Sequence, residues 1–281
     1  MTSPLVSNPR YVSLQMTAFY TMKFTLLLTL LPCNTILTLH SWAIKWQTQF
    51  NSKKCHILSL TRKRYKPIVI YHLGSEVLSQ VDSYPYLGVT VASDLCWHIH
   101  VSTICTKATR VLNFVRRNVY NCSPEAKALA YLSPVRPHLE YAAAAWDPHL
   151  TKDVKQLEGV QRRAARFACH NYHFASSVSA LLDRLQWPLL SSRRKNCRLT
   201  LFYKAVHNQI AIPLIHLQKP IRTTRQSNST TFTAIPTRSD VYKFSFLPRT
   251  VTDWNSLPQE VRDKPTFLSF RHALAAPSPC C

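Results

Sequence analysis

Hydrophobic residues after Trp97 recur at the three- and four-residue intervals that place side chains on one face of an α-helix. The first such run predicts a helix from about Val101, with basic residues on its opposite face. Its apolar members are Val101, Ile104, Ala108, Val111, Leu112 and Val115. A second helix is predicted to open at Ser123-Pro124, because serine is a favoured N-cap and proline a favoured first helical residue.

Helical periodicity returns in three later segments. They are about Lys152–Cys169, about Leu189–Asn208 and about Phe267–Leu274. Pro134 and Pro137 are expected to end the second helix before the segment Leu139–Trp146. The Thr- and Ser-rich stretch Gln218–Tyr242 has no such period, which predicts a long loop.

Before Trp97 the apolar segments are short and are separated by turn-forming residues. They predict small antiparallel strands at Lys54–Thr61, Pro67–Leu73, Glu76–Val81 and Tyr86–Ala92. Gly74 and Ser83-Tyr84-Pro85 are predicted to be breaks between these strands. The fold class expected is therefore α+β and mostly α-helical, with a small antiparallel sheet followed by helices.

The first forty residues differ from the rest of the chain. They contain no Asp or Glu, and their only basic residues are Arg10 and Lys23. Phe19–Leu39 is almost wholly apolar and Thr-rich, but Pro32 interrupts it. A membrane-spanning helix needs about 20 apolar residues, whereas the hydrophobic part of a signal peptide needs only about 7–15. A secreted or membrane-anchored protein that uses Phe19–Leu39 is therefore one alternative interpretation.

The charge balance of the chain gives the strongest indication of its partner. Among 281 residues, 35 are Lys or Arg and 13 are Asp or Glu, which gives a formal net charge of +22. Such an excess needs a polyanion, so nucleic acid is the first partner expected and an anionic membrane surface the second. Hydrophobic residues make up 46% of the chain, which is enough to bury a core. Only 3 glycines occur, and no Gly-rich phosphate-binding motif is present.

No catalytic or metal-binding motif stands out. The 9 cysteines include no Cys-x-x-Cys pair, which favours reduced thiols in an intracellular protein, nuclear or cytoplasmic. Cys96, His98, His100 and Cys105 are the nearest approach to a metal cluster. Their run passes from a predicted strand into a predicted helix, so the four side chains are not expected to converge, and no metal site is predicted. The sequence also has no Asp-Asp pair for two-metal chemistry.

The predicted solvent-facing sides of the helices carry charge of almost one sign. A charged helix face is ordinarily just the solvated face, but this one-sidedness favours contact with a phosphate backbone. The candidate nucleic-acid-binding residues on these helices are Lys107, Arg110, Arg116, Arg117, Arg162, Arg163, Arg166, Arg193 and Arg194. No motif for reading bases is present, so we expect binding that follows the backbone and the shape of the nucleic acid.

Several strings, read in order, resemble one family. They are Trp42-Ala43-x-x-Trp46-Gln47-x-x-Phe50-Asn51-x-x-Lys54-Cys55, Tyr86-Leu87-Gly88-Val89, Leu95-x-Trp97-x-x-His100, Leu112-x-Phe114-x-Arg116-Arg117-Asn118, Val135-Arg136-Pro137-x-Leu139-Glu140-Tyr141-Ala142, Trp146-Asp147-Pro148, Leu157-Glu158-x-Val160-Gln161-Arg162-Arg163-Ala164-Ala165-Arg166-Phe167, Ser245-Phe246-x-Pro248-Arg249-Thr250 and Asp253-Trp254-Asn255-x-Leu257-Pro258. Together they resemble the C-terminal part of a non-LTR retrotransposon (LINE-type, jockey-like) reverse transcriptase. The resemblance covers roughly 41–274.

The resemblance implies five segments. These are an out-of-frame or disordered stretch over 1–40, a remnant of the polymerase palm over 41–97, thumb-like helices over 98–150, a basic helical extension over 151–217 and a loop-rich C-terminal region over 218–281. Intact family members are RNA-directed DNA polymerases that bind Mg²⁺ through a Phe/Tyr-Ala-Asp-Asp strand. Since that strand is absent here, no cofactor is expected, and neither is polymerase activity. The partner implied is RNA or an RNA/DNA duplex.

Two matched positions would carry functional roles in the family. Lys54 matches a lysine that the resemblance suggests protonates the pyrophosphate leaving group, although an exposed strand lysine is the ordinary interpretation. Tyr86, Leu87 and Gly88 match a hairpin that grips the primer end, although an ordinary turn has the same residues. The alternative to the polymerase fragment is a stand-alone basic, helical nucleic-acid-binding protein.

A shift of the reading frame would account for the absence of the Asp-Asp pair. Read one nucleotide earlier, the codons of Gln15-Met16-Thr17 encode Asn or Asp followed by Asp. The codon before them then encodes Ala, Pro, Ser or Thr, so an Ala-Asp-Asp motif fits. This suggests a frameshift upstream of about His40, and with it the expectation that the first forty residues contribute nothing to the fold.

Overall fold

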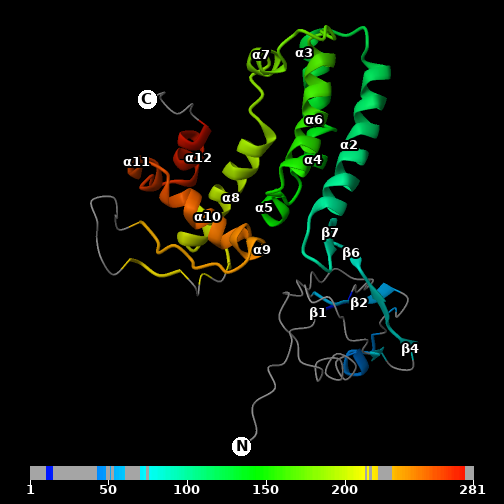
Figure 1. Ribbon diagram of the computed structural model, residues 1–281, viewed down its shortest axis with the longest axis vertical. Helices are drawn as coiled ribbons and strands as arrows, with labels where there is room; N and C mark the ends of the chain where they lie inside the picture. The colour runs from blue at the N-terminus through cyan, green and yellow to red at the C-terminus, as the bar shows by residue number, and fades with distance from the viewer. Residues whose placement is uncertain are drawn as a thin grey trace, which may run out of the picture. The chain divides into compact units, whose positions relative to one another are not determined.

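A computed structural model describes residues 11–14, 43–48, 51, 54–60, 70–73, 76–212, 214, 217–220 and 230–275. The chain divides into two compact units, Met1–His100 and Val101–Cys281. All the strands described lie in the first unit, and almost all the helical residues lie in the second (Figure 1). The prediction of a mostly helical α+β protein, with small sheets followed by helices, is confirmed.

One sheet of the first unit joins strands far apart in the sequence. Its order is β1 (Tyr11–Leu14), β2 (Cys55–Leu58) and β5 (Ser79–Val81), with β1 antiparallel and β5 parallel to β2. The expectation of antiparallel pairing alone is therefore wrong for β2 and β5. The expectation that the first forty residues contribute nothing to the fold is wrong for β1, which pairs with the whole of β2. The remainder of that segment lies outside the described residues.

The other strands form two small antiparallel pairs. β3 (His72–Leu73) pairs with β4 (Glu76–Val77), and β6 (Ser83–Tyr86) pairs with β7 (Val89–Ala92). The predicted break at Ser83-Tyr84-Pro85 is wrong, because these residues form most of β6. Pro85 is compatible with that strand, since each strand of a two-stranded sheet has one edge that needs no ladder hydrogen bond.

The helices from His98 onward follow the predicted order. They are α2 (His98–Asn118), α3 (Pro124–Leu132), α4 (Arg136–Glu140) and α5 (Ala143–Trp146). Ser123 is the N-cap of α3, as predicted, and its hydroxyl accepts a hydrogen bond from the backbone N–H of Ala126 at 3.3 Å. Pro137 lies in the first turn of α4, so it helps to begin a helix rather than to interrupt one.

The central helices are held together by buried polar contacts as well as by apolar packing. They are α6 (Thr151–Ala168), α7 (Val178–Arg184) and α8 (Leu190–Val206). The buried carboxylate of Glu158 on α6 accepts hydrogen bonds from the backbone N–H groups of Leu190 and Ser191, at 3.3 and 2.8 Å. Glu158 therefore caps the N-terminus of α8, where a negative charge is favoured.

The C-terminal region contains more helix than its loop-like sequence predicted. It comprises α9 (Asp240–Lys243), α10 (Phe246–Asn255), α11 (Gln259–Arg262) and α12 (Phe267–Ala275). α10 and α12 both pack on α8, and the three helices share one buried cluster. Its members are Leu199, Phe202, Tyr203, Val251, Trp254 and Phe270. The expectation of a loop-rich region over 218–281 therefore misses α9, α10 and α11, whereas the helix predicted at about Phe267–Leu274 is confirmed as α12.

Across the portion that the structure describes, no helix is both long enough and apolar enough to cross a membrane. Phe19–Leu39, the segment on which the membrane alternative rests, lies outside that portion.

Candidate nucleic-acid interface

One stripe of exposed side chains runs along α2. Lys107, Arg110, Phe114 and Arg117 are all exposed and follow one another at helical spacing, so they share a side of the helix. The ring of Phe114 is 59% exposed, which places an aromatic side chain between the cations. The 21 residues of α2 include no Asp or Glu. This α2 stripe is therefore positive along its whole length, with no acid on the same helix to neutralise it.

A second stripe runs along α6. Its cations are Lys152, Lys155, Arg162, Arg163 and Arg166, of which all but the half-buried Arg166 are exposed. The helix also carries Asp153 and Glu158, but these two acids are only 2% and 5% exposed. The charge that this α6 stripe presents to solvent is thus entirely positive. The sequence pattern placed Lys155 and Arg162 on the exposed side, but it could not show that Arg166 is half-buried or that both acids are buried.

α2 and α6 contact each other and run in the same direction. Arg163 of α6 donates a hydrogen bond to the Thr109 hydroxyl of α2 at 3.1 Å. Farther along both helices, the guanidinium of Arg116 on α2 lies 5.9 Å from the ring centroid of Phe167 on α6. Arg116 therefore faces α6, and the prediction that it shares a face with Lys107 and Arg110 is wrong. Its C-terminal neighbour Arg117 remains on the α2 stripe.

The two candidate arginines at the start of α8 are engaged inside the protein. Arg193 is half-buried and forms a bidentate ion pair with Glu140. Its Nε donates to Glu140 Oε1, and its Nη2 donates to Glu140 Oε2 at 3.0 Å. Arg194 is 1% exposed, so it cannot reach a phosphate group in this fold. The placement of Arg194 on a solvated basic face is wrong, because Leu190 and Arg198 share its buried side of α8.

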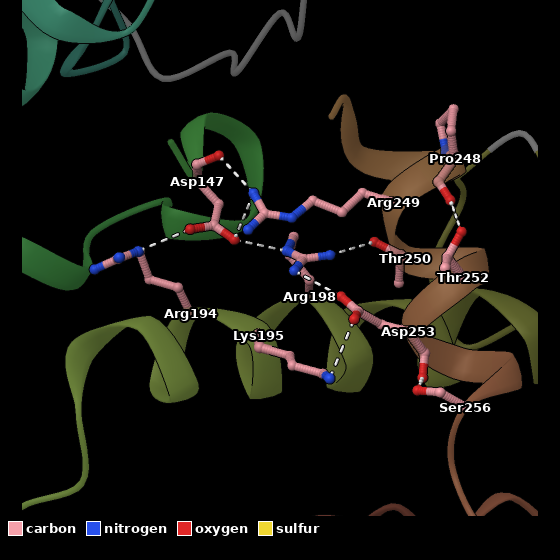
Figure 2. A network of polar contacts seen from close by, with 10 residues as sticks. All are labelled: Asp147, Arg194, Lys195, Arg198, Pro248, Arg249, Thr250, Thr252, Asp253 and Ser256. Carbon is pink, nitrogen blue, oxygen red and sulfur yellow. Dashed lines mark hydrogen bonds and ion pairs between the residues drawn. The ribbon is translucent and has the colours of Figure 1, made fainter. Parts of the chain in front are cut away.

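Arg194 belongs to a buried polar network that joins α5, α8 and α10 (Figure 2). The carboxylate of Asp147, just after α5, receives Arg194 Nε at 2.8 Å, Arg198 Nε at 2.9 Å and Arg249 Nη1 at 3.2 Å. Asp147 is itself only 7% exposed. One buried carboxylate therefore forms ion pairs with three arginines from two different helices.

A second aspartate completes this polar network. Asp253 on α10 pairs with Arg198 Nη2 at 2.8 Å and with Lys195 Nζ at 3.1 Å. The hydroxyl of Thr250 accepts a further hydrogen bond from Arg198 at 3.2 Å. Burial lowers the pKa of Arg249, while the nearby Asp147 acts in the opposite direction. With every ionisable side chain engaged in ion pairs between helices, this arrangement fits a structural role.

The two candidates in the first unit are linked through one tyrosine. Lys54 is exposed and directly precedes β2, and its backbone carbonyl accepts a hydrogen bond from the Tyr84 hydroxyl at 3.1 Å. Tyr84 lies on β6, which leads into the tip formed by Leu87 and Gly88 after Tyr86. The tip has positive φ at both positions, 47° and 82°, and Leu87 is 68% exposed. Positive φ at both positions matches the tight hairpin turn that the glycine allows.

The residues do not fit a metal centre. In the described ranges no group of three or more His, Cys, Asp or Glu side chains could hold a metal ion. His100 is buried and its Nδ1 accepts a hydrogen bond from the backbone N–H of Thr90 at 3.1 Å. Burial raises the pKa of the Cys105 thiol to about 11, which keeps it protonated at neutral pH and makes it a poor ligand. Among the residues described, no cluster of carboxylates could hold Mg²⁺.

One group of exposed residues was not predicted from the sequence. Tyr120 follows α2, and Tyr172 and Phe174 follow α6; their exposed fractions are 54%, 49% and 90%. The available signal was the string His170-Asn171-Tyr172-His173-Phe174, which is rich in rings and directly follows a basic helix. The proximity of Tyr120 to this string could not be inferred from the sequence.

No family model, no curated protein and no solved structure matches this chain.

Proposed function

We propose that this protein binds nucleic acid through the phosphate backbone, using the α2 and α6 stripes. The observation that carries the proposal is that every exposed charged side chain on these two long helices is basic. Both acids of α6 are buried, and α2 has none. Concentrated positive charge of this kind is the electrostatic footprint of a backbone-binding surface.

The geometry of the α2 stripe suits a polyanion. Lys107 and Arg117 are ten residues apart, which corresponds to about 15 Å along a helix that rises 1.5 Å per residue. A B-form DNA duplex advances about 3.4 Å per base pair, so the stripe is as long as roughly four phosphates of one strand of such a duplex. No base-reading motif is present, so we expect binding without regard to sequence. The resemblance to reverse transcriptases favours RNA or an RNA/DNA duplex as the ligand.

For the origin of the chain, we propose a degenerate reverse-transcriptase fragment without polymerase activity. The support is the ordered set of strings that resembles that family, together with the absence of any Asp-Asp pair from the sequence. Two-metal nucleotidyl transfer needs carboxylates to hold the ions against the reacting phosphate. The chain would then retain binding surfaces of the ancestor but not its chemistry.

The purified protein is expected to give no template-dependent extension when incubated with a primed RNA template, Mg²⁺ and deoxynucleotides, because it lacks the carboxylates that would hold the metal ions. The readout is extended primer on a denaturing gel, with an active reverse transcriptase on the same template as the positive control. Extension that depends on this protein and on the template would contradict the fragment assignment.

Binding to a duplex is expected to weaken steeply with salt. Replacing Lys107, Arg110 and Arg117 with glutamine should reduce affinity by about ten- to a hundredfold, if each exposed ion pair with a phosphate contributes about 0.5–1 kcal/mol. The slope of log K against log salt should fall by up to about 3, roughly one unit for each phosphate that is no longer neutralised. The measurement is fluorescence anisotropy with a labelled duplex at several salt concentrations.

The matched control for this experiment removes the same charge elsewhere. Lys219, Arg238 and Arg271 are exposed and lie outside α2 and α6. Replacing these three with glutamine should change the salt slope far less than the α2 variant does. Equal effects of the two triple variants would show that only net charge matters, and the assignment to the stripes would then be wrong.

A further inference from the structure

Five ring-bearing residues come together where α2 and α6 end. Tyr120 contacts His170 edge-on, with ring centroids 5.9 Å apart, and His170 contacts Tyr172 in the same way at 5.9 Å. His173 stacks on Phe174 with centroids 4.9 Å apart. This group, Tyr120, His170, Tyr172, His173 and Phe174, is called the aromatic end below. It joins the segment after α2 to the segment after α6.

The rings of the aromatic end remain accessible despite these contacts. Phe174 is 90% exposed, Tyr120 54% and Tyr172 49%. Single exposed apolar residues are ordinary on a protein surface, but a group of exposed aromatic rings marks a site of interaction. The stack on His173 can cover only one face of the Phe174 ring, so its other face is open to a flat partner.

Basic residues lie near these rings. The Arg166 guanidinium donates a hydrogen bond to the His173 carbonyl at 3.0 Å. The exposed Arg117 lies in the last turn of α2, and the Nζ of the buried Lys127 lies 5.7 Å from the ring centroid of Tyr120. The sequence has no Asp or Glu from His98 to Pro124 or from Gly159 to Leu182. The local charge therefore complements a polyanion.

We propose that the aromatic end binds unpaired bases of single-stranded nucleic acid by stacking. The proposal rests on the proposed function, since it assumes that the neighbouring basic stripes hold a phosphate backbone. Bases inside a duplex are stacked on one another, so aromatic side chains on a protein surface can reach only unpaired bases. Open ring faces beside cations are the combination that single-strand-binding proteins use.

The test compares a single-stranded oligonucleotide of about 12 nucleotides, within the usual range of site sizes, with a blunt duplex of the same sequence. In the Tyr172→Ala/Phe174→Ala variant, affinity for the single strand should fall by about ten- to a hundredfold. Affinity for the blunt duplex should change less than twofold. A 2-aminopurine base in the single strand should be quenched by the parent protein and not by this variant.

Two further variants separate stacking from a structural role. Tyr172→Phe/Phe174→Trp retains the rings and should retain single-strand affinity and quenching. Tyr242→Ala removes an exposed ring, 44% exposed, outside the aromatic end and should leave both unchanged. An equal loss of single-strand and duplex affinity in the double alanine variant would overturn the stacking proposal.

The remaining outcomes distinguish the two proposals. Salt-dependent duplex binding by the parent protein, with single-strand affinity unaffected by the double alanine variant, would overturn the stacking proposal alone. No binding to either oligonucleotide would overturn the proposed function and stacking together. Binding to vesicles of anionic phospholipid that is lost in the double alanine variant, without quenching of 2-aminopurine, would identify the aromatic end as a membrane contact and overturn stacking.

Discussion

Replacing Asp147 with alanine is expected to lower the melting temperature of the helical unit by about 10 °C. The substitution leaves Arg194 and Arg198, which are 1% and 2% exposed, without their shared carboxylate. Removing one partner of a buried ion pair typically costs about 3–5 kcal/mol, and each kcal/mol shifts the melting temperature of a unit of this size by about 2–4 °C. The measurement is thermal unfolding followed by circular dichroism at fixed salt.

The burial of Arg194 is the main reason to expect this loss of stability. Its two terminal nitrogens are buried and form no hydrogen bond with any described residue. Its charge is therefore compensated mainly through the single contact between Nε and Asp147. When that contact is removed, the guanidinium is left buried without its ionic partner.

Two variants show whether charge compensation is the cause. Asp147→Asn retains the shape and one oxygen acceptor but loses the charge, so its melting temperature should fall between those of the parent and Asp147→Ala. Asp183→Asn changes an exposed aspartate and should shift stability by no more than about 0.5 kcal/mol. A melting temperature of Asp147→Ala equal to that of the parent would show that the network does not hold α5, α8 and α10 together.

This network also gives a structural role to residues of several strings quoted in the sequence analysis. Asp147 comes from Trp146-Asp147-Pro148, whereas Arg249 and Asp253 come from two strings near the C-terminus. All three side chains meet around α8 (Figure 2). The residues of these strings therefore contribute packing and charge compensation to the fold. The same holds for Glu158, whose carboxylate caps α8.

The sequence predicted long amphipathic helices well because their signal is local. α2 and α6 each carry four or more turns of apolar periodicity, and Ser123-Pro124 is a complete start signal for α3. The helices α9 to α11 have ten residues or fewer, too few for the period to stand out. α10 packs on α8, α9 packs on α10 and α11 packs on α12, so these helices are stabilised by tertiary contacts that no local pattern reports.

The candidate interface was predictable only in part for the same reason. Periodicity placed Lys107, Arg110 and Arg162 on exposed sides, but it gave Arg194 the same expected position. What separates Arg194 from them is Asp147, which lies far away in the sequence and meets it only in the fold. The pairing of β1 with β2 is likewise non-local, and the apolar character of the surrounding segment obscured it.

The second large effect is expected from Trp254→Ala, at a cost of about 3–5 kcal/mol in the free energy of unfolding. Trp254 is 1% exposed and lies between Phe202 and Phe270, with ring centroids 5.2 and 5.6 Å away. Its indole Nε1–H donates to the Thr230 carbonyl at 2.8 Å. Truncation therefore leaves a cavity between α8, α10 and α12 and removes a partner of a backbone carbonyl.

Two companion variants divide this effect into its parts. Trp254→Phe keeps most of the ring and loses the hydrogen bond, so it should cost about 1–2 kcal/mol plus a small packing loss. Leu268→Ala shortens a side chain that is 64% exposed on α12 and should cost less than about 0.5 kcal/mol. Urea unfolding followed by circular dichroism measures all three without relying on tryptophan fluorescence. If Trp254→Ala unfolds at the same urea concentration as Leu268→Ala, the cluster around α8 contributes nothing to stability, and α8 must be held by its polar contacts alone.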